Sequence, residues 1–120
     1  MKFTNILYIE DDPDTRYLQA RLWRKFDGHA EVASPEQWDA LRGSFEWVLL
    51  DFHLGAETAL DWIPKISARF PEARIALLSN LDSEHPSVRQ ITSLDVQFFS
   101  KPMPLDTLRE WASTTASKSD

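Results

Sequence analysis

The sequence predicts an α/β domain in which helices cover both faces of a five-stranded parallel sheet. Three observations support this fold class. Five apolar segments of strand length, residues 6–9, 31–33, 45–50, 75–78 and 96–99, alternate with stretches that have helical spacing. Such alternation favours a parallel, doubly wound sheet. The segments ending at Leu50 and Leu78 are almost entirely apolar, as expected for strands buried on both faces.

Length and composition fit one compact unit. The chain has 120 residues, the size of a single domain, and 42% of them are hydrophobic. Only three residues are Gly, whereas five are Trp and seven are Phe, so large rings are expected to fill much of the core. We expect one three-layer domain over residues 1–112, followed by a flexible polar tail over residues 113–120.

Charge and cysteine content argue against several classes of function. The net charge is −6 and no run of Lys or Arg occurs, which argues against binding to nucleic acid. The chain has no Cys, which fits a reducing compartment. No N-terminal apolar run is long enough for a signal peptide or a membrane span. We therefore expect a cytoplasmic protein without membrane contact, present as a monomer or weak dimer.

Apolar spacing predicts which face of each helix is buried. In the first helical stretch Leu18, Leu22 and Phe26 lie four residues apart, which predicts an apolar stripe. Four more stripes follow: Trp38 and Leu41; Leu60, Ile63, Ile66 and Phe70; Val88, Ile91 and Leu94; Leu105, Leu108 and Ala112.

Cap and proline signals predict where three of these helices begin. Ser34 as N-cap, Pro35 and Gln37 form a capping box. Ser83 as N-cap would place Pro86 in a first turn. Pro64 predicts either a helix that starts late, near Asp61, or a kink.

Polar side chains follow four of the five predicted strands. In open parallel sheets the carboxyl ends of the strands form the ligand site, so these side chains are expected at one edge. Taken singly, each has an ordinary explanation, such as Asp12 capping a helix. Together, the carboxylates would repel one another unless a cation or proton intervenes. The residues are Glu10, Asp11 and Asp12 after the first strand, Asp51 after the third, Ser79 after the fourth and Lys101 after the fifth.

This set of side chains suits phosphoryl transfer. Mg²⁺ prefers a few carboxylates together with water and phosphate oxygens. A carboxylate can attack phosphorus and form an acyl phosphate. A Lys ammonium and a Ser hydroxyl can both interact with the phosphoryl oxygens. Such reactions depend mostly on positioning and charge neutralisation.

Four segments resemble the signatures of response-regulator receiver domains, in the right order and at the right intervals. They are residues 6–13 (ILYIEDDP), 48–51 (VLLD), 77–79 (LLS) and 98–102 (FFSKP), and the resemblance extends from about Asn5 to Trp111. It implies the flavodoxin-like (βα)5 fold and a role in bacterial two-component or phosphorelay signalling. It also implies a phosphoacceptor that gains and loses its own phosphoryl group, rather than an enzyme that turns over a substrate.

The resemblance assigns roles by position. Asp51 would accept the phosphoryl group, and Lys101 would pair with it. Ser79 would follow the phosphoryl group, and Phe98 would be the aromatic ring that moves with it. The Lys101–Pro102 bond would be cis. Mg²⁺ would be held by Glu10, Asp11, Asp51 and the backbone carbonyl of His53.

The partners implied are a sensor histidine kinase or a histidine phosphotransfer protein, and a downstream protein target. The chain departs from the family pattern at Gly55, Ala59, Asn80 and Leu81, which puts the lifetime of the phosphoryl group in question. The segment 51–54 also resembles receivers attached to hybrid sensor kinases.

Other functions stay open at this stage. One is a degenerate receiver that binds a partner without phosphorylation. Another is a receiver cut from a hybrid kinase or a longer regulator. A Mg²⁺-dependent aspartyl phosphohydrolase is disfavoured, because His53 stands where such enzymes carry a second acid. A zinc site at His53 is disfavoured because the other two His have no ligand spacing.

Overall fold

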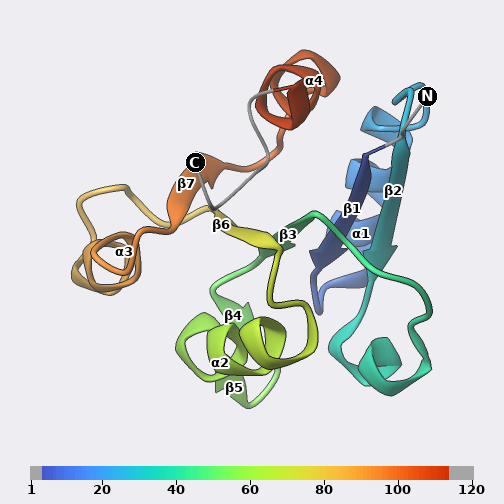
Figure 1. Ribbon diagram of the computed structural model, residues 1–120. Coiled ribbons are helices and arrows are strands. Elements are labelled where there is room, and N and C mark those ends of the chain that lie inside the picture. The colour runs from blue at the N-terminus through green and yellow to red at the C-terminus, as the bar shows by residue number, and fades with distance from the viewer. Residues whose placement is uncertain (1–3, 114–120) are drawn as a thin grey trace.

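The computed structural model describes residues 4–113, which fold around one parallel sheet (Figure 1). Its strand order is β2-β1-β3-β6-β7. The order reverses between β1 and β3, and open α/β sheets bind their ligands at the carboxyl ends of the strands beside such a reversal. The predicted fold class is confirmed. The strands are β1 (Asn5–Ile9), β2 (His29–Ala33), β3 (Trp47–Leu50), β6 (Arg74–Ser79) and β7 (Gln97–Ser100).

Helices lie on both faces of the sheet, and Figure 1 shows α2 and α4 on opposite sides of it. Within residues 4–113, no helix is both long and apolar enough to cross a membrane. An antiparallel hairpin of β4 (His53–Leu54) and β5 (Glu57–Thr58), not anticipated from the sequence, connects β3 to α2. The helices are α1 (Pro13–Leu22), the 3₁₀ helix η1 (Pro35–Ala40), α2 (Ala59–Arg69), α3 (Pro86–Thr92) and α4 (Leu105–Ser113).

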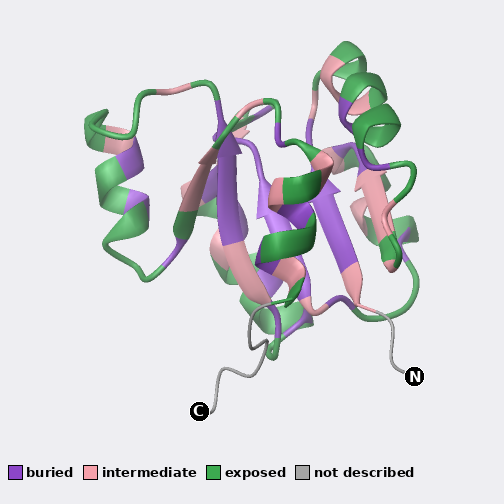
Figure 2. Ribbon diagram, turned by 90° about the horizontal axis from the view of Figure 1, so that it is seen from above, coloured by how far each residue is buried: buried purple, intermediate pink, exposed green. Residues whose placement is uncertain are grey.

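Two hydrophobic cores form because successive residues of a strand point to opposite faces. Leu7 and Ile9 of β1 join the core beneath α2 and α3, whereas Ile6 and Tyr8 join the core beneath α4. The central strands are buried, and the edge strands β2 and β7 are only partly buried (Figure 2). This arrangement explains the nearly continuous apolar sequence of β3, all four residues of which are buried.

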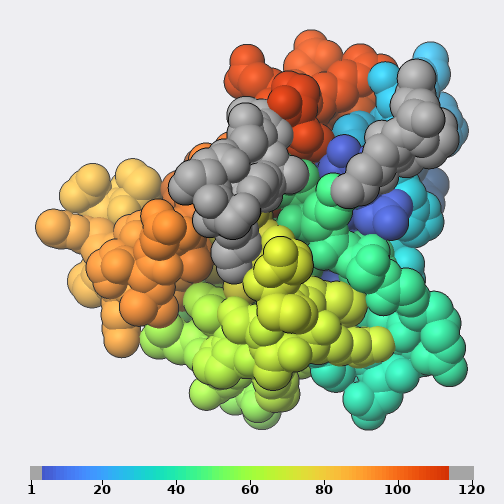
Figure 3. Space-filling model, in the orientation of Figure 1, coloured from blue at the N-terminus to red at the C-terminus, as the bar shows by residue number. Residues whose placement is uncertain are grey.

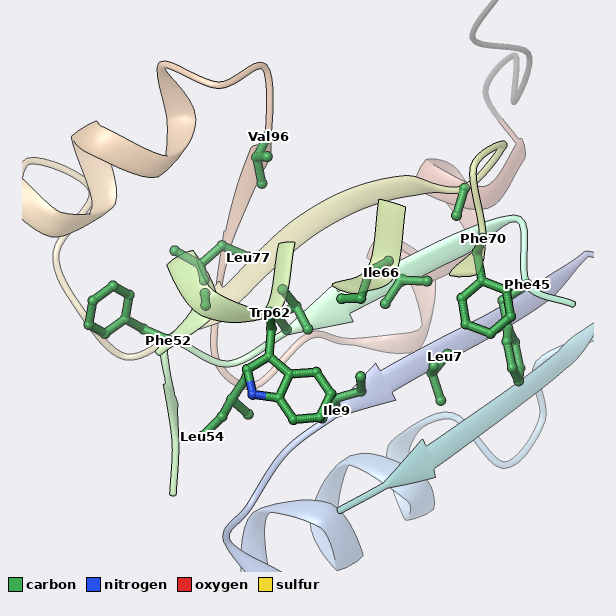
Figure 4. Packing of buried hydrophobic residues seen from close by; sticks show 14 of the residues in the cluster. Leu7, Ile9, Phe45, Phe52, Leu54, Trp62, Ile66, Phe70, Leu77 and Val96 are labelled. Atoms are coloured by element: carbon green, nitrogen blue, oxygen red, sulfur yellow. The ribbon is translucent and has the colours of Figure 1, made fainter. Parts of the chain in front are cut away.

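Large rings fill both cores, as the composition predicts. The ring of Trp38 in η1 meets the ring of Trp62 in α2 edge-on, with centroids 5.3 Å apart. These two helices lie side by side (Figure 3). Phe45 meets Phe70 at 5.4 Å in the same core, which Figure 4 shows together with Trp62. On the other face the rings of Trp47 and Trp111 are 4.3 Å apart. Edge-on and tilted contacts of this kind add to the stability gained by burial.

The apolar stripe predicted for the first helix is wrong at Leu18 and Leu22, whereas its third member, Phe26, packs against the core beneath α4. Leu18 is 49% exposed and Leu22 is 36% exposed, whereas Gln19 is 1% exposed and Trp23 is 3% exposed. A polar side chain tolerates burial where it finds hydrogen-bond partners. Gln19 has such partners in the loop before α4, so the helix turns this side, and not the leucine stripe, toward the sheet.

The predicted helix after Ser34 exists, but as a six-residue 3₁₀ helix. Its capping box is confirmed, because the Ser34 N–H donates to Gln37 Oε1 at 2.8 Å. The helix that contains Pro64 begins at Ala59, so the late start near Asp61 is wrong and the proline lies inside the helix.

Four smaller expectations concern α3 and the C-terminal end. His85, not Ser83, is the N-cap of α3, and its Nδ1 accepts a hydrogen bond from the Ser87 N–H at 3.1 Å. Pro86 does lie in the first turn, as predicted. Leu94 follows the end of α3 and is 54% exposed, so its predicted burial is wrong. Of the expected tail, Ser113 is the last residue of α4, and residues 114–120 lie outside the described residues.

We predict that Ile66→Ala lowers the free energy of unfolding by about 2–5 kcal/mol, because it leaves a cavity beside the buried side chains of the sheet. Leu18→Ala should change it by less than about 0.5 kcal/mol, since the leucine is 49% exposed and lies outside both cores. Urea unfolding followed by tryptophan fluorescence measures both. Equal losses in the two variants would contradict the orientation of α1.

Candidate functional site

Backbone hydrogen bonds hold the residues that follow the strands at one edge of the sheet. The Asp51 N–H donates to the Ile9 carbonyl at 3.1 Å, which extends the pairing of β3 with β1. The Lys101 N–H likewise donates to the Ser79 carbonyl at 3.1 Å, which extends the pairing of β7 with β6. The structure thus places Asp51, Ser79 and Lys101 at the edge that the sequence predicts.

Three of the predicted acids meet there. Glu10, Asp11 and Asp51 each offer one carboxylate oxygen, and these oxygens lie within 4.8 Å of one another. Glu10 is 1% exposed and Asp51 is 9% exposed, while Asp11 is the most accessible of the three. Carboxylates this close repel one another, so the group favours binding of a cation.

Lys101 provides positive charge inside the cluster. Its Nζ lies 2.6 Å from Glu10 Oε1 and 3.2 Å from Asp51 Oδ2. The Lys101 side chain is 10% exposed, so solvent screens these ion pairs less than pairs on the surface. The amine therefore links the carboxyl end of β1, followed by Glu10, to the carboxyl end of β3, followed by Asp51.

Glu10 is also held by groups that the sequence analysis missed. The Tyr8 hydroxyl donates to Glu10 Oε1 at 2.5 Å, and the Asp12 N–H donates to Oε2 at 3.1 Å. The Arg16 guanidinium donates to the Glu10 backbone carbonyl at 2.8 Å. Burial, with the neighbouring Glu10 carboxylate, raises the pKa of Tyr8 far above its ordinary value. The sequence did contain a signal for the contact between Tyr8 and Glu10, because residues two apart in a strand share a face.

The environment of Asp51 makes its ionised form less favourable than that of an exposed Asp when no cation is bound. Burial and the charge of Glu10 raise its pKa to about 6, against the opposing effect of Lys101. The Phe52 N–H donates to Asp51 Oδ1 at 2.7 Å. The carboxylate is thus positioned by its own backbone neighbour, and a nearby positive charge would favour its ionised form.

Asp11 and Asp12 have different environments. Asp11 Oδ2 accepts a hydrogen bond from the Gly55 N–H at 3.0 Å, and Gly55 has a φ of +71°, which favours glycine. Asp12 Oδ2 instead accepts hydrogen bonds from the Thr15 N–H at 2.8 Å and the Thr15 hydroxyl at 2.6 Å. These bonds lower the pKa of Asp12. Asp12 therefore caps α1, which is the ordinary explanation for an acid at this position.

The remaining predicted residues lie around this cluster. Ser79 ends β6, is 2% exposed, and its Oγ accepts a hydrogen bond from the Leu81 N–H at 3.1 Å. Phe98 packs against the core beneath α2 and α3, and Phe99 against the opposite core, as expected for neighbours in a strand. The Lys101–Pro102 bond is cis, as predicted.

His53 lies in β4, two residues after Asp51. Its ring meets that of Phe52 edge-on at 4.9 Å, and its side chain is exposed. The role predicted for its backbone carbonyl in holding a metal stays a prediction.

The donor set fits a hard divalent cation. All three clustered side chains are carboxylates, and oxygen ligands of this kind suit Mg²⁺, which keeps several waters when it binds. The carboxylates of Glu10 and Asp51 both form an ion pair with the Lys101 amine, so both are oriented toward the same amine nitrogen. Asp11 is the most accessible of the three and offers the least obstructed approach from solvent.

Comparison with known proteins places this fold in one class. No family model matches the chain. In sequence, the chain is 29% identical to the response regulator protein PilR of Pseudomonas aeruginosa over 111 residues. The match covers 90% of this chain and 25% of PilR, so the chain spans about a quarter of the length of that relative.

Three solved structures share the fold. A CheY-like receiver domain protein from Methanospirillum hungatei aligns with a TM-score of 0.74 at 17% identity, covering 96% of this chain and 94% of that one. A response regulator from Burkholderia pseudomallei, with a phosphorylated aspartic acid, calcium ion and citrate, gives 0.73 at 23%, covering 94% and 68%. The response regulator TrrA from Thermotoga maritima, in complex with Mg(2+)-BeF, gives 0.70 at 19%, covering 91% and 96%.

The chain therefore has the fold of the response-regulator receiver domains, and the resemblance seen in its sequence is confirmed. PilR is a relative of this chain in sequence.

We predict that Asp51→Asn stabilises the cation-free protein at neutral pH by about 1–3 kcal/mol, since one pKa unit corresponds to about 1.4 kcal/mol. The folded pKa of about 6 exceeds the ordinary value of 3.8, so the contribution of Asp51 to wild-type stability falls as pH rises from about 4 to about 6. The variant lacks this fall. Urea unfolding in a chelator across this range measures the difference, with the exposed Asp39→Asn as a charge control. A variant less stable than wild type at neutral pH would contradict the prediction.

Proposed function

We propose that the chain is a working receiver in which Asp51 accepts a phosphoryl group. The observation that carries this proposal is the Lys101 amine, which lies 2.6 Å from Glu10 and 3.2 Å from Asp51 at the edge where the acids meet. The confirmed receiver fold supports it. The donor would be a phosphohistidine on a sensor histidine kinase or a histidine phosphotransfer protein.

The transfer follows from the groups present. An ionised Asp51 oxygen attacks phosphorus in line with the leaving group. The bond from phosphorus to the donor nitrogen breaks, and the imidazole leaves with the bonding electron pair and takes up a proton. The product is an acyl phosphate. Lys101 balances negative charge on the phosphoryl oxygens, because its amine already contacts the accepting carboxylate.

Glu10, Asp11 and Asp51 are the side chains that would hold Mg²⁺, with the His53 carbonyl as a further ligand. When bound, the cation neutralises phosphoryl oxygens and favours the ionised form of Asp51. Glu10 and Asp11 contribute orientation, because each is fixed by a backbone N–H, that of Asp12 and that of Gly55 respectively.

The output is proposed to be a change of surface around β6, α3 and β7. The Ser79 hydroxyl would exchange its bond with the Leu81 N–H for a phosphoryl oxygen, and Phe98 would occupy the space released. Such a change is a shift between two packings of the same core, biased by the new contacts. It would alter binding to a downstream protein in the cytoplasm. In this proposal the chain does not turn over a substrate.

Two other functions are compatible with this fold. The chain spans a quarter of PilR, so a receiver that belongs to a longer regulator or hybrid kinase fits the comparison. A receiver that binds a partner without phosphorylation would use the same fold. The phosphorylation experiment separates this second reading from the proposal.

We predict that acetyl phosphate with Mg²⁺ adds one hydroxylamine-labile phosphoryl group to the wild type and none to Asp51→Asn, as read by intact mass. Lys101→Met should slow the reaction by about 10²-fold or more, in the range seen when one charge-stabilising group is removed. No adduct on the wild type, even with a phosphorylated kinase as donor, would overturn the proposal. Turnover of a small phosphate ester would instead favour the phosphohydrolase.

We predict that Asp11→Asn weakens Mg²⁺ binding about 10-fold or more, because a charged ligand is lost from the cluster. The matched control is Asp12→Asn, which keeps a good N-cap residue for α1 and lies one position outside the cluster. Calorimetric titration with MgCl₂ measures both affinities. Equal weakening in the two variants would show that the acids act only through general charge.

A further inference from the structure

A buried glutamine ties α1 to the loop that follows Lys101. Gln19 is 1% exposed, and its Nε2 donates to the Met103 carbonyl at 2.7 Å. The Met103 N–H donates back to Gln19 Oε1 at 3.1 Å. The Trp23 Nε1 donates to the same carbonyl at 3.0 Å. Two side chains of one helical segment therefore satisfy both backbone groups of Met103, which is itself 0% exposed.

This anchor uses the first backbone N–H that follows that of Lys101. The Lys101 N–H is held by the Ser79 carbonyl of β6. Pro102 has no N–H, so Met103 carries the next backbone donor along the chain. Lys101 is thus held on one side by the sheet and on the other by α1. Buried Gln is uncommon, and its burial here is compensated by two hydrogen bonds to one residue.

The segment that carries Gln19 and Trp23 also contacts Tyr8, which is the second hydrogen-bond partner of Glu10. The Trp23 ring packs on the Tyr8 ring, with centroids 5.7 Å apart. The Tyr8 hydroxyl and the Lys101 amine both contact Glu10 Oε1. The segment that carries Gln19 and Trp23 therefore supports both groups that bind this oxygen.

We propose that Gln19 is a positioning residue for Lys101, acting through Met103, with Trp23 as its second contact. The inference rests on the proposed function, in which the Lys101 amine must lie against the accepting carboxylate. Charged groups that assist a reaction depend on being held within about 0.5 Å of the productive position by surrounding contacts. A loop released from α1 would let the amine leave its ion pairs and spend more time in solvent.

The first test is Gln19→Met, which keeps an unbranched side chain of similar length and removes both hydrogen bonds. Gln90→Met, at an exposed position of α3, is the matched control. Each protein is treated with an amine-acetylating reagent, and the labelling rate of every lysine is read by peptide mass spectrometry. We expect Lys101 to be labelled at least about 3-fold faster in Gln19→Met, because it is only 10% exposed in the wild type. Labelling of Lys65 should not change.

The second test is a double-mutant cycle on phosphorylation by acetyl phosphate at saturating Mg²⁺. We expect Gln19→Met to lower the rate at saturating donor by about 10-fold, as for a misplaced catalytic group, with unchanged Mg²⁺ affinity. In a Lys101→Met background the same change should have no further effect, because the residue acts through Lys101. If the role of Gln19 is purely structural, Gln19→Met lowers stability but does not change the labelling of Lys101. Its effect on the rate is then the same in the wild-type and Lys101→Met backgrounds.

The outcomes are separable from those of the proposed function. If the wild type takes no phosphoryl group, the receiver proposal fails, and Lys101 labelling still decides whether Gln19 positions the amine. If Gln19→Met does not fold, Trp23→Phe replaces it, since it removes one donor to the Met103 carbonyl and keeps an aromatic ring against Tyr8. Unchanged Lys101 labelling in a folded variant of either kind overturns the inference.

Discussion

The contact of Lys101 with two buried carboxylates is the interaction on which the site depends. Glu10 and Asp51 end neighbouring strands and would repel each other strongly without a cation between them. The amine offsets part of this repulsion, but the pKa of Asp51 stays raised, which leaves the site ready for a further positive charge. The site is therefore a balance of charges held at one edge of the sheet.

The packing of both faces of the sheet fixes the positions of the strand ends that carry these charges. Both faces of the sheet are buried beneath helices, and tryptophan and phenylalanine rings interlock within each core. Close-packed interiors of this kind do not deform continuously. In the proposed function, a change in the charges at the edge would be answered by a discrete repacking that includes Phe98, which is partly buried against the core beneath α2 and α3.

The sequence predicted the sheet and its acidic edge better than the faces of its helices. Glu10, Asp51 and Lys101 were placed correctly because each follows an apolar strand, and parallel strands end at one edge. The Leu18 and Leu22 stripe failed because periodicity measures only hydrophobicity. It could not register that a buried amide on Gln19 would find two backbone partners 84 residues along the chain. For the same reason, the apolar pattern of β1 did not indicate that the Tyr8 hydroxyl would donate to Glu10.

By itself, then, the sequence determined the alternation of strands and helices, the parallel sheet and the order in which chemical groups reach its edge. These properties follow from local periodicity and from the handedness of crossover connections. Only the tertiary structure decided which face of α1 is buried, that the segment after β2 coils as a 3₁₀ helix, and which hydrogen bonds fix Glu10 and Lys101. Those features depend on partners distant in sequence, whose proximity exists only once the chain has folded.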